Sequence, residues 1–248
     1  GGTAVGTGLN AEKVYPERMV EELRRLTNLE VEEGADKVQL MQSMGDVAAF
    51  SGVLRAYTLD LNRVANDVRL LASGPRTGLA EIVLPAVQPG SSIMPGKVNP
   101  SIAEMVNQVC YQVLGLDTTV ALASEAGQLE LNVMMPVIAH NLLFGLTLLT
   151  SATRTFDERC IAGIEADEAM CAHWLERSPA LVTALAPTIG YAEAAKLAKE
   201  ALATGMTVRE LVVRRVVLDG DALDAVLDLR AMTEPGVPGE EGPDGGDG

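Results

Sequence analysis

The sequence is short of the residues that most binding chemistries need. Its 248 residues include three cysteines, two histidines, one tryptophan, four tyrosines and three phenylalanines, and 19 basic residues face 34 acidic ones. The net charge of −15 argues against a nucleic acid or an anionic membrane as partner, because both attract a basic face. So few aromatic rings also argue against a base-stacking platform. The sequence therefore predicts no nucleic-acid partner and no membrane partner.

The scarcity of cysteine and histidine limits metal and disulfide chemistry in the same way. Cys110, Cys160 and Cys171 contain no C-x-x-C pair, and only His140 and His173 are available to join them. We therefore expect no metal site. Three cysteines cannot build a disulfide framework, so we expect them to be reduced and packed, as in a cytoplasmic protein. We expect His140, within an apolar segment, to be buried and hydrogen-bonded.

The chain does contain long apolar stripes at helical spacing. Three segments repeat apolar residues in alternating steps of three and four, which is typical of long helices that pack together as a bundle. The first stripe lies in the proline-free stretch 36–73, the second runs over 102–123 and the third over 135–156. We predict an all-α fold built on three long helices, the first of them unbroken from 36 to 73. Helices of this length and apolarity favour a homo-oligomeric bundle.

The most apolar segment, residues 133–149, raises the question of a membrane span. Pro136, His140, Asn141 and Thr147 interrupt it, whereas a membrane-spanning helix needs about 20 predominantly apolar residues. We therefore predict a helix that is buried inside a bundle of helices.

Shorter helical signals follow the third stripe. A helix fits 192–204 and would end at Gly205, and Thr207 with Glu210 forms a capping-box pattern that opens the next helix. We predict a central long-helix domain over residues 1–157 and a small helical C-terminal domain over residues 158–234. Residues 235–248 are mostly glycine, proline and acidic residues, which predicts a disordered tail.

Near the start of the chain, Gly6-x-Gly8-x-x-Ala11 matches the dinucleotide-binding fingerprint by letter. That fingerprint requires a preceding strand and a βαβ unit, and the residues before Gly6 predict no strand. We interpret the segment as a loop that leads into a helix near residues 16–28.

Residues 74–100, between the first two long helices, form the most informative segment. They contain five prolines and four glycines, so they cannot be helical, although a short strand fits 82–84. Long irregular connections in compact domains usually carry function. Within this connection, Ser91 and Ser92 supply hydroxyls, Lys97 supplies a positive charge and Asn99 supplies an amide. Together with the N-terminus of the next helix, these groups suit a carboxylate on which further negative charge develops.

The same residues also fit a plain helix start. Asn99 before Pro100 is a good N-cap, and Ser101-x-x-Glu104 is itself a capping-box pattern. Lys97 would then be a solvated loop residue. Composition alone leaves both interpretations open.

The pattern Gly90-Ser91-x-x-Met94-x-x-Lys97-x-Asn99 resembles the signature of the fumarase/aspartase superfamily, and the long-helix arrangement around it is similar. Segments 2–10 and 131–133 also look like stretches of that superfamily, and the resemblance extends to about residue 236. Segment 125–134 is more similar to aspartases than to fumarases, whereas Met135 departs from both.

The resemblance implies a bundle of the fumarase/aspartase type and a homotetramer whose active sites are shared between subunits. The implied reaction is the reversible elimination of ammonia from L-aspartate to give fumarate, without a cofactor. Ser91 would be the base that removes the Cβ proton, while Ser92, Lys97 and Asn99 would bind the C4 dicarboxylate. Glu104 would pair with a histidine of another segment.

The family also has residues that this chain lacks. Its chains continue well before the segment that matches Gly1, and there they supply a Ser-Ser/Thr-Asn loop and a Thr-His pair. The resemblance therefore implies the C-terminal portion of a longer cytoplasmic lyase, of the aspartate ammonia-lyase type. The alternatives are a class II fumarate hydratase and a catalytically incomplete helical oligomerisation fragment.

Overall fold

The computed structural model describes residues 2–88, 90, 93–94 and 98–239. The described chain is helical apart from two short paired strands and irregular connections, which confirms the all-α prediction. It divides into two compact units, the first formed by Gly1–Ser73 with Ile82–Glu165 and the second by Gly74–Glu81 with Ala166–Gly248. The elements are α1 (Tyr15–Thr27), α2 (Lys37–Gln42), α3 (Gly45–Leu71), β1 (Ile82–Val83), α4 (Ser101–Glu125), α5 (Met135–Arg159), β2 (Glu165–Ala166), α6 (Glu168–Arg177), α7 (Val182–Ile189), α8 (Tyr191–Thr204), α9 (Val208–Arg215) and α10 (Gly220–Val226).

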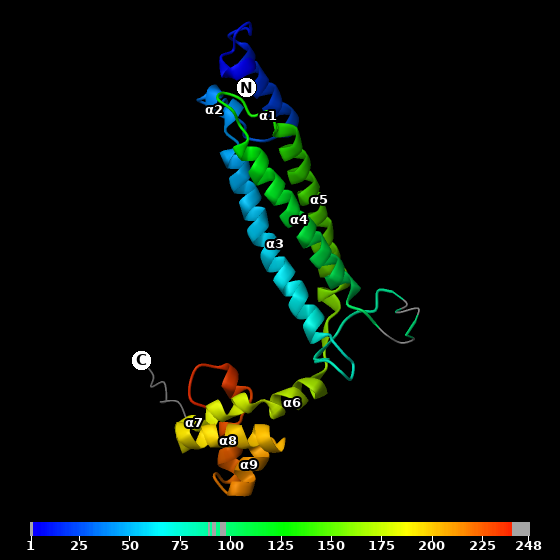
Figure 1. The fold of residues 1–248 in the computed structure, drawn as a ribbon, viewed down its shortest axis with the longest axis vertical. Helices are drawn as coiled ribbons and strands as arrows, with labels where there is room; N and C mark the ends of the chain where they lie inside the picture. The colour runs from blue at the N-terminus through cyan, green and yellow to red at the C-terminus, as the bar shows by residue number, and fades with distance from the viewer. Residues whose placement is uncertain (1, 89, 91–92, 95–97, 240–248) are drawn as a thin grey trace. The chain divides into compact units, whose positions relative to one another are not determined.

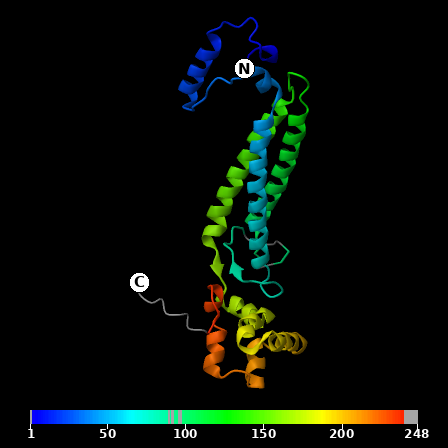
Figure 2. The same cartoon turned by 90° about the vertical axis from the view of Figure 1, so that its left-hand side faces the viewer.

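Three long helices form the body of the first unit. α3, α4 and α5 run side by side, and each is antiparallel to the helix before it (Figures 1 and 2). The predicted third stripe is confirmed, because α5 buries one continuous face. The buried members of that stripe are Ile138, Gly145, Leu149, Ala152 and Phe156.

The predicted unbroken helix over residues 36–73 is wrong. The Asp36 carboxylate accepts hydrogen bonds from the backbone N–H groups of Val38 and Gln39, at 3.0 Å each, and so caps the short helix α2. Ser43 then adopts an extended conformation (φ −88°, ψ 125°), and α3 begins only at Gly45. The absence of proline from 36 to 73 could not exclude this break, because Ser43 leaves the helical conformation without a proline.

The face that α3 buries also differs from the predicted stripe. Its buried residues include the small side chains of Ser51, Thr58 and Ala65, whereas Phe50 and Tyr57 are 48% and 44% exposed. Small side chains let two helix backbones approach closely, which large rings would prevent. Phe50 and Tyr57 are therefore left on the surface of this chain, whereas Val68 is buried.

A buried carboxylate joins α3 to α4. Asp117 accepts a hydrogen bond from the Ser51 hydroxyl at 2.6 Å, and its second oxygen pairs with the Arg55 guanidinium at 2.9 Å. Burying a charge is costly unless it is paired and hydrogen-bonded, and both oxygens of Asp117 meet that condition. The apolar spacing in the sequence did not predict this pair, because it gives no information on buried polar residues.

Asn132 ties the connection between α4 and α5 to its surroundings. Its side-chain amide donates to the carbonyls of Ala123 (3.0 Å) and Ser124 (3.2 Å), and its side-chain oxygen accepts from the Met134 N–H at 2.8 Å. Its own N–H donates to the Met41 carbonyl at 3.0 Å. With only 1% of its surface exposed, Asn132 satisfies backbone groups at the end of one helix and the start of the next.

One segment of the described chain, Met135–Gly163, has the length and hydropathy of a membrane-spanning helix. A core helix in a bundle has the same properties, and α5 packs along its buried stripe and carries the buried amide of Asn141. We therefore interpret it as a bundle helix. Only 28% of the most apolar stretch of this segment is buried within this chain. Much of its apolar surface is therefore left for other helices to cover.

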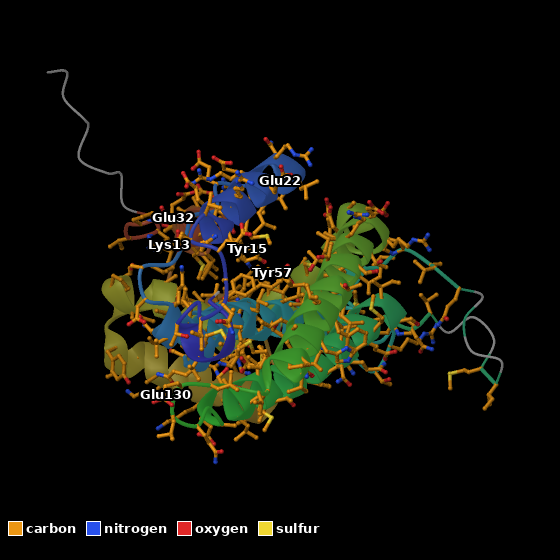
Figure 3. All side chains as sticks on the ribbon, turned by 90° about the horizontal axis from the view of Figure 1, so that it is seen from above. Lys13, Tyr15, Glu22, Glu32, Tyr57 and Glu130 are labelled. Carbon is orange, nitrogen blue, oxygen red and sulfur yellow. The ribbon has the colours of Figure 1, made fainter. Side chains whose placement is uncertain are left out.

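The first helix, α1, has no buried residue. Figure 3 shows its side chains, Tyr15 and Glu22 among them, spread around the ribbon. The glycine pattern before it serves backbone packing, because Gly6 has a φ of +81° and a Cβ on it would lie 2.6 Å from the Lys37 backbone. Gly6 of this glycine pattern thus allows the chain to pack closely against the backbone of Lys37.

The second unit has its own apolar core, formed mainly by α7 to α10. Gly205 ends α8 in the left-handed conformation, and the Thr207–Glu210 capping box opens α9, as predicted. The predicted disordered tail lies mostly outside the described residues, since 240–248 are not among them.

Candidate active site

The candidate site lies on the connection between α3 and α4. α3 ends at Leu71 and α4 begins at Ser101, so the connection joins the end of one long helix to the start of the next. Of the predicted site residues, Ser91, Ser92 and Lys97 lie outside the described residues, whereas Asn99 and Glu104 lie within them. Both are partly buried, Asn99 just before α4 and Glu104 in its first turn.

The side-chain caps expected in the plain helix-start interpretation are not formed, whereas the position of Lys97 lies outside the described residues. Pro100 occupies the N-cap position of α4, and no side chain caps the helix. The Glu104 backbone N–H donates to the Pro100 carbonyl at 3.0 Å, and within the described chain the side chains of Asn99 and Glu104 make no hydrogen bond or ion pair. Neither side chain is therefore occupied in capping α4, and both are available to a ligand or to another chain.

The two ends of the signature segment are tied to each other. The Gln88 side-chain amide donates to the Ser101 hydroxyl at 2.5 Å, which joins a residue shortly before the signature segment (residues 90–99) to the first residue of α4. Gly90 has a φ of +88°, a conformation that a side chain would strain. Gln88 and Ser101, which flank the signature segment, are therefore in direct contact.

A polar network that the sequence analysis missed joins the same two helices. Arg69, in the last turn of α3, donates from Nη1 to Asn107 Oδ1 at 2.9 Å, and Asn107 Nδ2 donates to Asn62 Oδ1 at 2.8 Å. Asn107 is only 2% exposed and lies one turn beyond Glu104 on α4. A signal was present in the sequence, since a buried stripe of α4 that contains a polar residue needs a polar partner.

The first part of the connection belongs to the second unit. The Trp174 indole N–H donates to the Leu79 carbonyl at 2.6 Å, and the Cys171 thiol donates to the Glu81 carbonyl at 3.4 Å. The Asp167 N–H also donates to the Glu81 carbonyl, at 2.9 Å. Helix α6 and Asp167 before it thus bind the irregular stretch of residues 79–81, which precedes the signature segment in the sequence.

The prediction that His140 is buried and hydrogen-bonded is wrong. Its side chain is exposed on α5 and stacks on Phe144, with ring centroids 6.0 Å apart. His173 is also exposed and meets Trp174 edge-on, at 5.1 Å between centroids. Neither histidine is hydrogen-bonded to Glu104 in the described part of the chain.

The cysteines are unpaired, and burial raises the pKa of the Cys110 and Cys160 thiols. Both lie in the core that joins α3, α4 and α5. Across the residues that the structure describes, no three His, Cys, Asp or Glu side chains are grouped as a metal site would require.

Comparison with known proteins agrees with this architecture. The family described as "Lyase" matches residues 1–115, and the family described as "Fumarase C C-terminus" matches residues 181–234. The aspartate ammonia-lyase of Bacillus subtilis is 46% identical over 241 residues, which are 97% of this chain and 51% of that protein. The class II fumarate hydratase of Bacillus cereus is 45% identical over 235 residues, which are 95% of this chain and 51% of that protein.

A solved structure gives the same result for the fold. The fumarate lyase:delta crystallin from Brucella melitensis bound to cobalt superposes with a TM-score of 0.88 at 50% identity, over 95% of this chain and 51% of that one. The chain spans about half the length of the curated relatives it matches. The two lyase families match separate parts of the chain, and the chain belongs to the fumarase/aspartase superfamily.

Proposed function

We propose that the protein containing this chain eliminates ammonia from L-aspartate to give fumarate. The observation that carries the proposal is the signature segment, which enters a helix whose first turn is capped by no side chain. The free N–H groups there contribute partial positive charge directly after Asn99. The 46% identity to a relative named aspartate ammonia-lyase supports the choice of substrate.

In the proposed reaction, the Ser91 side chain, deprotonated to its alkoxide, takes the proton from Cβ of aspartate and becomes a hydroxyl. The electron pair left on Cβ delocalises into the neighbouring carboxylate, which Lys97 and Asn99 hold together with loop N–H groups. The Cα–N bond then breaks, the electron pair forms the Cα–Cβ double bond, and the nitrogen leaves as ammonia. Ser92 binds the substrate, and Glu104 pairs with a histidine from another chain segment. The reaction requires no organic cofactor.

Hydration of fumarate to malate is the second candidate, because a class II fumarate hydratase is 45% identical. The two activities are separated by offering L-aspartate and L-malate in parallel to the complete protein and following fumarate by its ultraviolet absorbance. We expect fumarate to form from L-aspartate at least about a hundredfold faster (kcat/KM) than from L-malate, because a site built for one polar group rejects its analogue. The reverse preference would make the protein a hydratase. If neither substrate gave fumarate, the remaining alternative would be a catalytically incomplete oligomerisation fragment.

We also propose that the protein forms a homotetramer with active sites shared between subunits and works in the cytoplasm, where its free cysteines remain reduced. The support is the apolar surface of the bundle: Val53 on α3 is 67% exposed, and Leu143 and Phe144 on α5 are 65% and 43% exposed. Contiguous exposed apolar surface on long helices is typical of subunit contacts.

Light scattering of the complete protein is expected to give the mass of four chains, and the Leu143→Glu substitution is expected to lower the measured mass. A single-chain mass for the unchanged protein would contradict the proposal.

A further inference from the structure

Helix α1 has an apolar face that the described chain leaves open. Four large side chains follow one another at helical spacing, so they share one side of the helix. This set, the α1 stripe, consists of Tyr15, Met19, Leu23 and Leu26, which are 49%, 40%, 42% and 69% exposed. α1 has no buried residue, and Figure 2 shows it set apart from the three long helices. Within the described part of the chain, the α1 stripe therefore remains uncovered.

An open hollow lies beside the α1 stripe. It has a volume of about 770 Å³ and is lined by α1 and by residues 9–12. Thr3 lines the same hollow, and Gly2, its neighbour in the chain, is buried. A segment attached ahead of Gly2 therefore starts beside the hollow.

An amphipathic helix of this length requires a packing partner. α1 has 13 residues, and isolated helices shorter than about 12 to 15 residues are marginal in water. In proteins, most of the stability of such a helix comes from packing of its apolar face. The α1 stripe therefore indicates that another segment covers it.

The charges of α1 disfavour a membrane surface as this partner. The helix carries three acidic and three basic residues, and the whole chain has a net charge of −15. Helices that lie on anionic membranes have mainly lysine and arginine opposite their apolar side. The partner is therefore a protein segment.

The size of the α1 stripe disfavours the same helix of a second copy. One side of a 13-residue helix is about 20 Å long and about 10 Å wide, whereas a stable interface between two proteins buries about 800 Å² on each partner. A segment of the same chain needs less area, because the covalent connection gives it an effective concentration of about a millimolar.

The length of the relatives provides such a segment. This chain spans about half the length of the curated relatives it matches. Residues 181–234 match the family described as "Fumarase C C-terminus", so the C-terminal part of those proteins is represented in this chain. The other half of their length therefore corresponds to sequence before Gly1, and it joins this chain beside the hollow.

We propose that the α1 stripe is the docking site for an apolar helix of the N-terminal half of the complete protein, on the same chain. The stripe supplies the apolar contact along α1, and the hollow receives the segment where it joins Gly2 and Thr3. The inference goes beyond the proposed function and does not depend on which reaction the protein catalyses.

Thiol labelling of the complete protein tests whether the α1 stripe is covered. Leu23→Cys places a thiol on the stripe, and the matched control Glu21→Cys places one on the opposite, exposed side of α1. With N-ethylmaleimide, an uncharged reagent, we expect the thiol at position 23 to react at least about twentyfold more slowly than the thiol at position 21, because a covered thiol is not accessible. Mass spectrometry of the α1 peptide separates this label from any on Cys110, Cys160 or Cys171. A smaller difference in rate overturns the proposal.

A second position covers the case in which Leu23→Cys does not fold, as judged by circular dichroism. Met19→Cys places the thiol one turn earlier on the same stripe. The same slow labelling relative to Glu21→Cys is expected, and fast labelling counts against the proposal in the same way.

Photo-cross-linking of the complete protein identifies the segment that covers the stripe. The photoreactive amino acid p-benzoylphenylalanine replaces Leu26 and forms a bond, on irradiation, to the segment that lies against it. We expect a product with the mass of one chain on a denaturing gel, and a cross-linked peptide from the sequence before Gly1. A product with the mass of two chains would assign the stripe to a second copy, and a bond to a peptide within 1–248 would assign it to this part of the chain. Either result overturns the proposal.

Neither measurement depends on turnover. Slow labelling and the expected cross-link in a protein that does not convert L-aspartate overturn the proposed function and leave this inference intact. Turnover of L-aspartate by a protein whose α1 stripe labels rapidly overturns the inference alone.

Discussion

Replacing Ser91 by alanine is expected to lower kcat for ammonia release from L-aspartate by about a thousandfold or more. The deprotonated Ser91 oxygen is the group that we propose as the base, and proton transfer by a positioned base contributes roughly two to four orders of magnitude to a rate. Alanine has no atom that can accept the proton, while Lys97 carries its own proton and Asn99 is not basic. The measurement is steady-state formation of fumarate by the complete protein, followed over a range of L-aspartate concentrations.

Two further serine variants show whether the loss is specific to Ser91. Ser92→Ala is expected to raise KM more than it lowers kcat, because we propose that this residue binds the substrate without taking a proton. Ser124→Ala removes a hydroxyl that bonds the Val120 carbonyl within α4, and it is expected to keep full activity. If Ser91→Ala retains more than a tenth of the original kcat with an intact helical spectrum, Ser91 is not the base.

Replacing Asn132 by alanine is expected to lower the free energy of unfolding by about 3 kcal/mol. The variant leaves two carbonyls and one N–H, those of Ala123, Ser124 and Met134, without their side-chain partner. The surroundings of the Asn132 side chain are almost closed to water, since Asn132 is 1% exposed. Each buried polar group left unpaired costs about 1 to 3 kcal/mol. Partial rearrangement of the connection between α4 and α5 recovers some of this cost. Urea unfolding followed by circular dichroism gives the value.

Asn66→Ala is the matched control, because Asn66 lies on the exposed side of α3. Alanine has the higher helix propensity, so this variant is expected to be as stable as the original or slightly more stable. A loss below about 1 kcal/mol for Asn132→Ala would mean that water replaces the amide, and the proposed role of Asn132 in joining the two helices would fail.

Apolar periodicity predicted the long helices well where packing is apolar on both sides. The stripe on α5 is an example, with Ile138, Leu149 and Phe156 all buried. It was only partly right on α3: Val68 of that stripe is buried, but the rest of the buried face is made by Ser51, Thr58 and Ala65, whose small or polar side chains do not register as a stripe. The same limitation concealed Asp117, a buried charge that only its partners on another helix make tolerable.

The candidate site was located by its residue types more than by its geometry. Lys97 and Asn99 within a proline- and glycine-rich connection indicated an anion, but Asn99 also fitted a helix cap, and only the backbone of Pro100 excluded that alternative. The network of Arg69 and Asn107 joins residues 38 positions apart. Such a contact depends on how two helices are aligned, which local sequence patterns do not specify.

The second unit consists of two stretches that are distant in the sequence, which affects the order in which the protein is built. The hydrogen bond between Trp174 and Leu79 spans 95 positions, and that between Cys171 and Glu81 spans 90. During synthesis, residues 74–81 emerge long before α6, and the whole hairpin of α4 and α5 lies between them. Because such non-local contacts form late and slowly, a nascent chain must leave this short piece undocked until the bundle that follows it has been made.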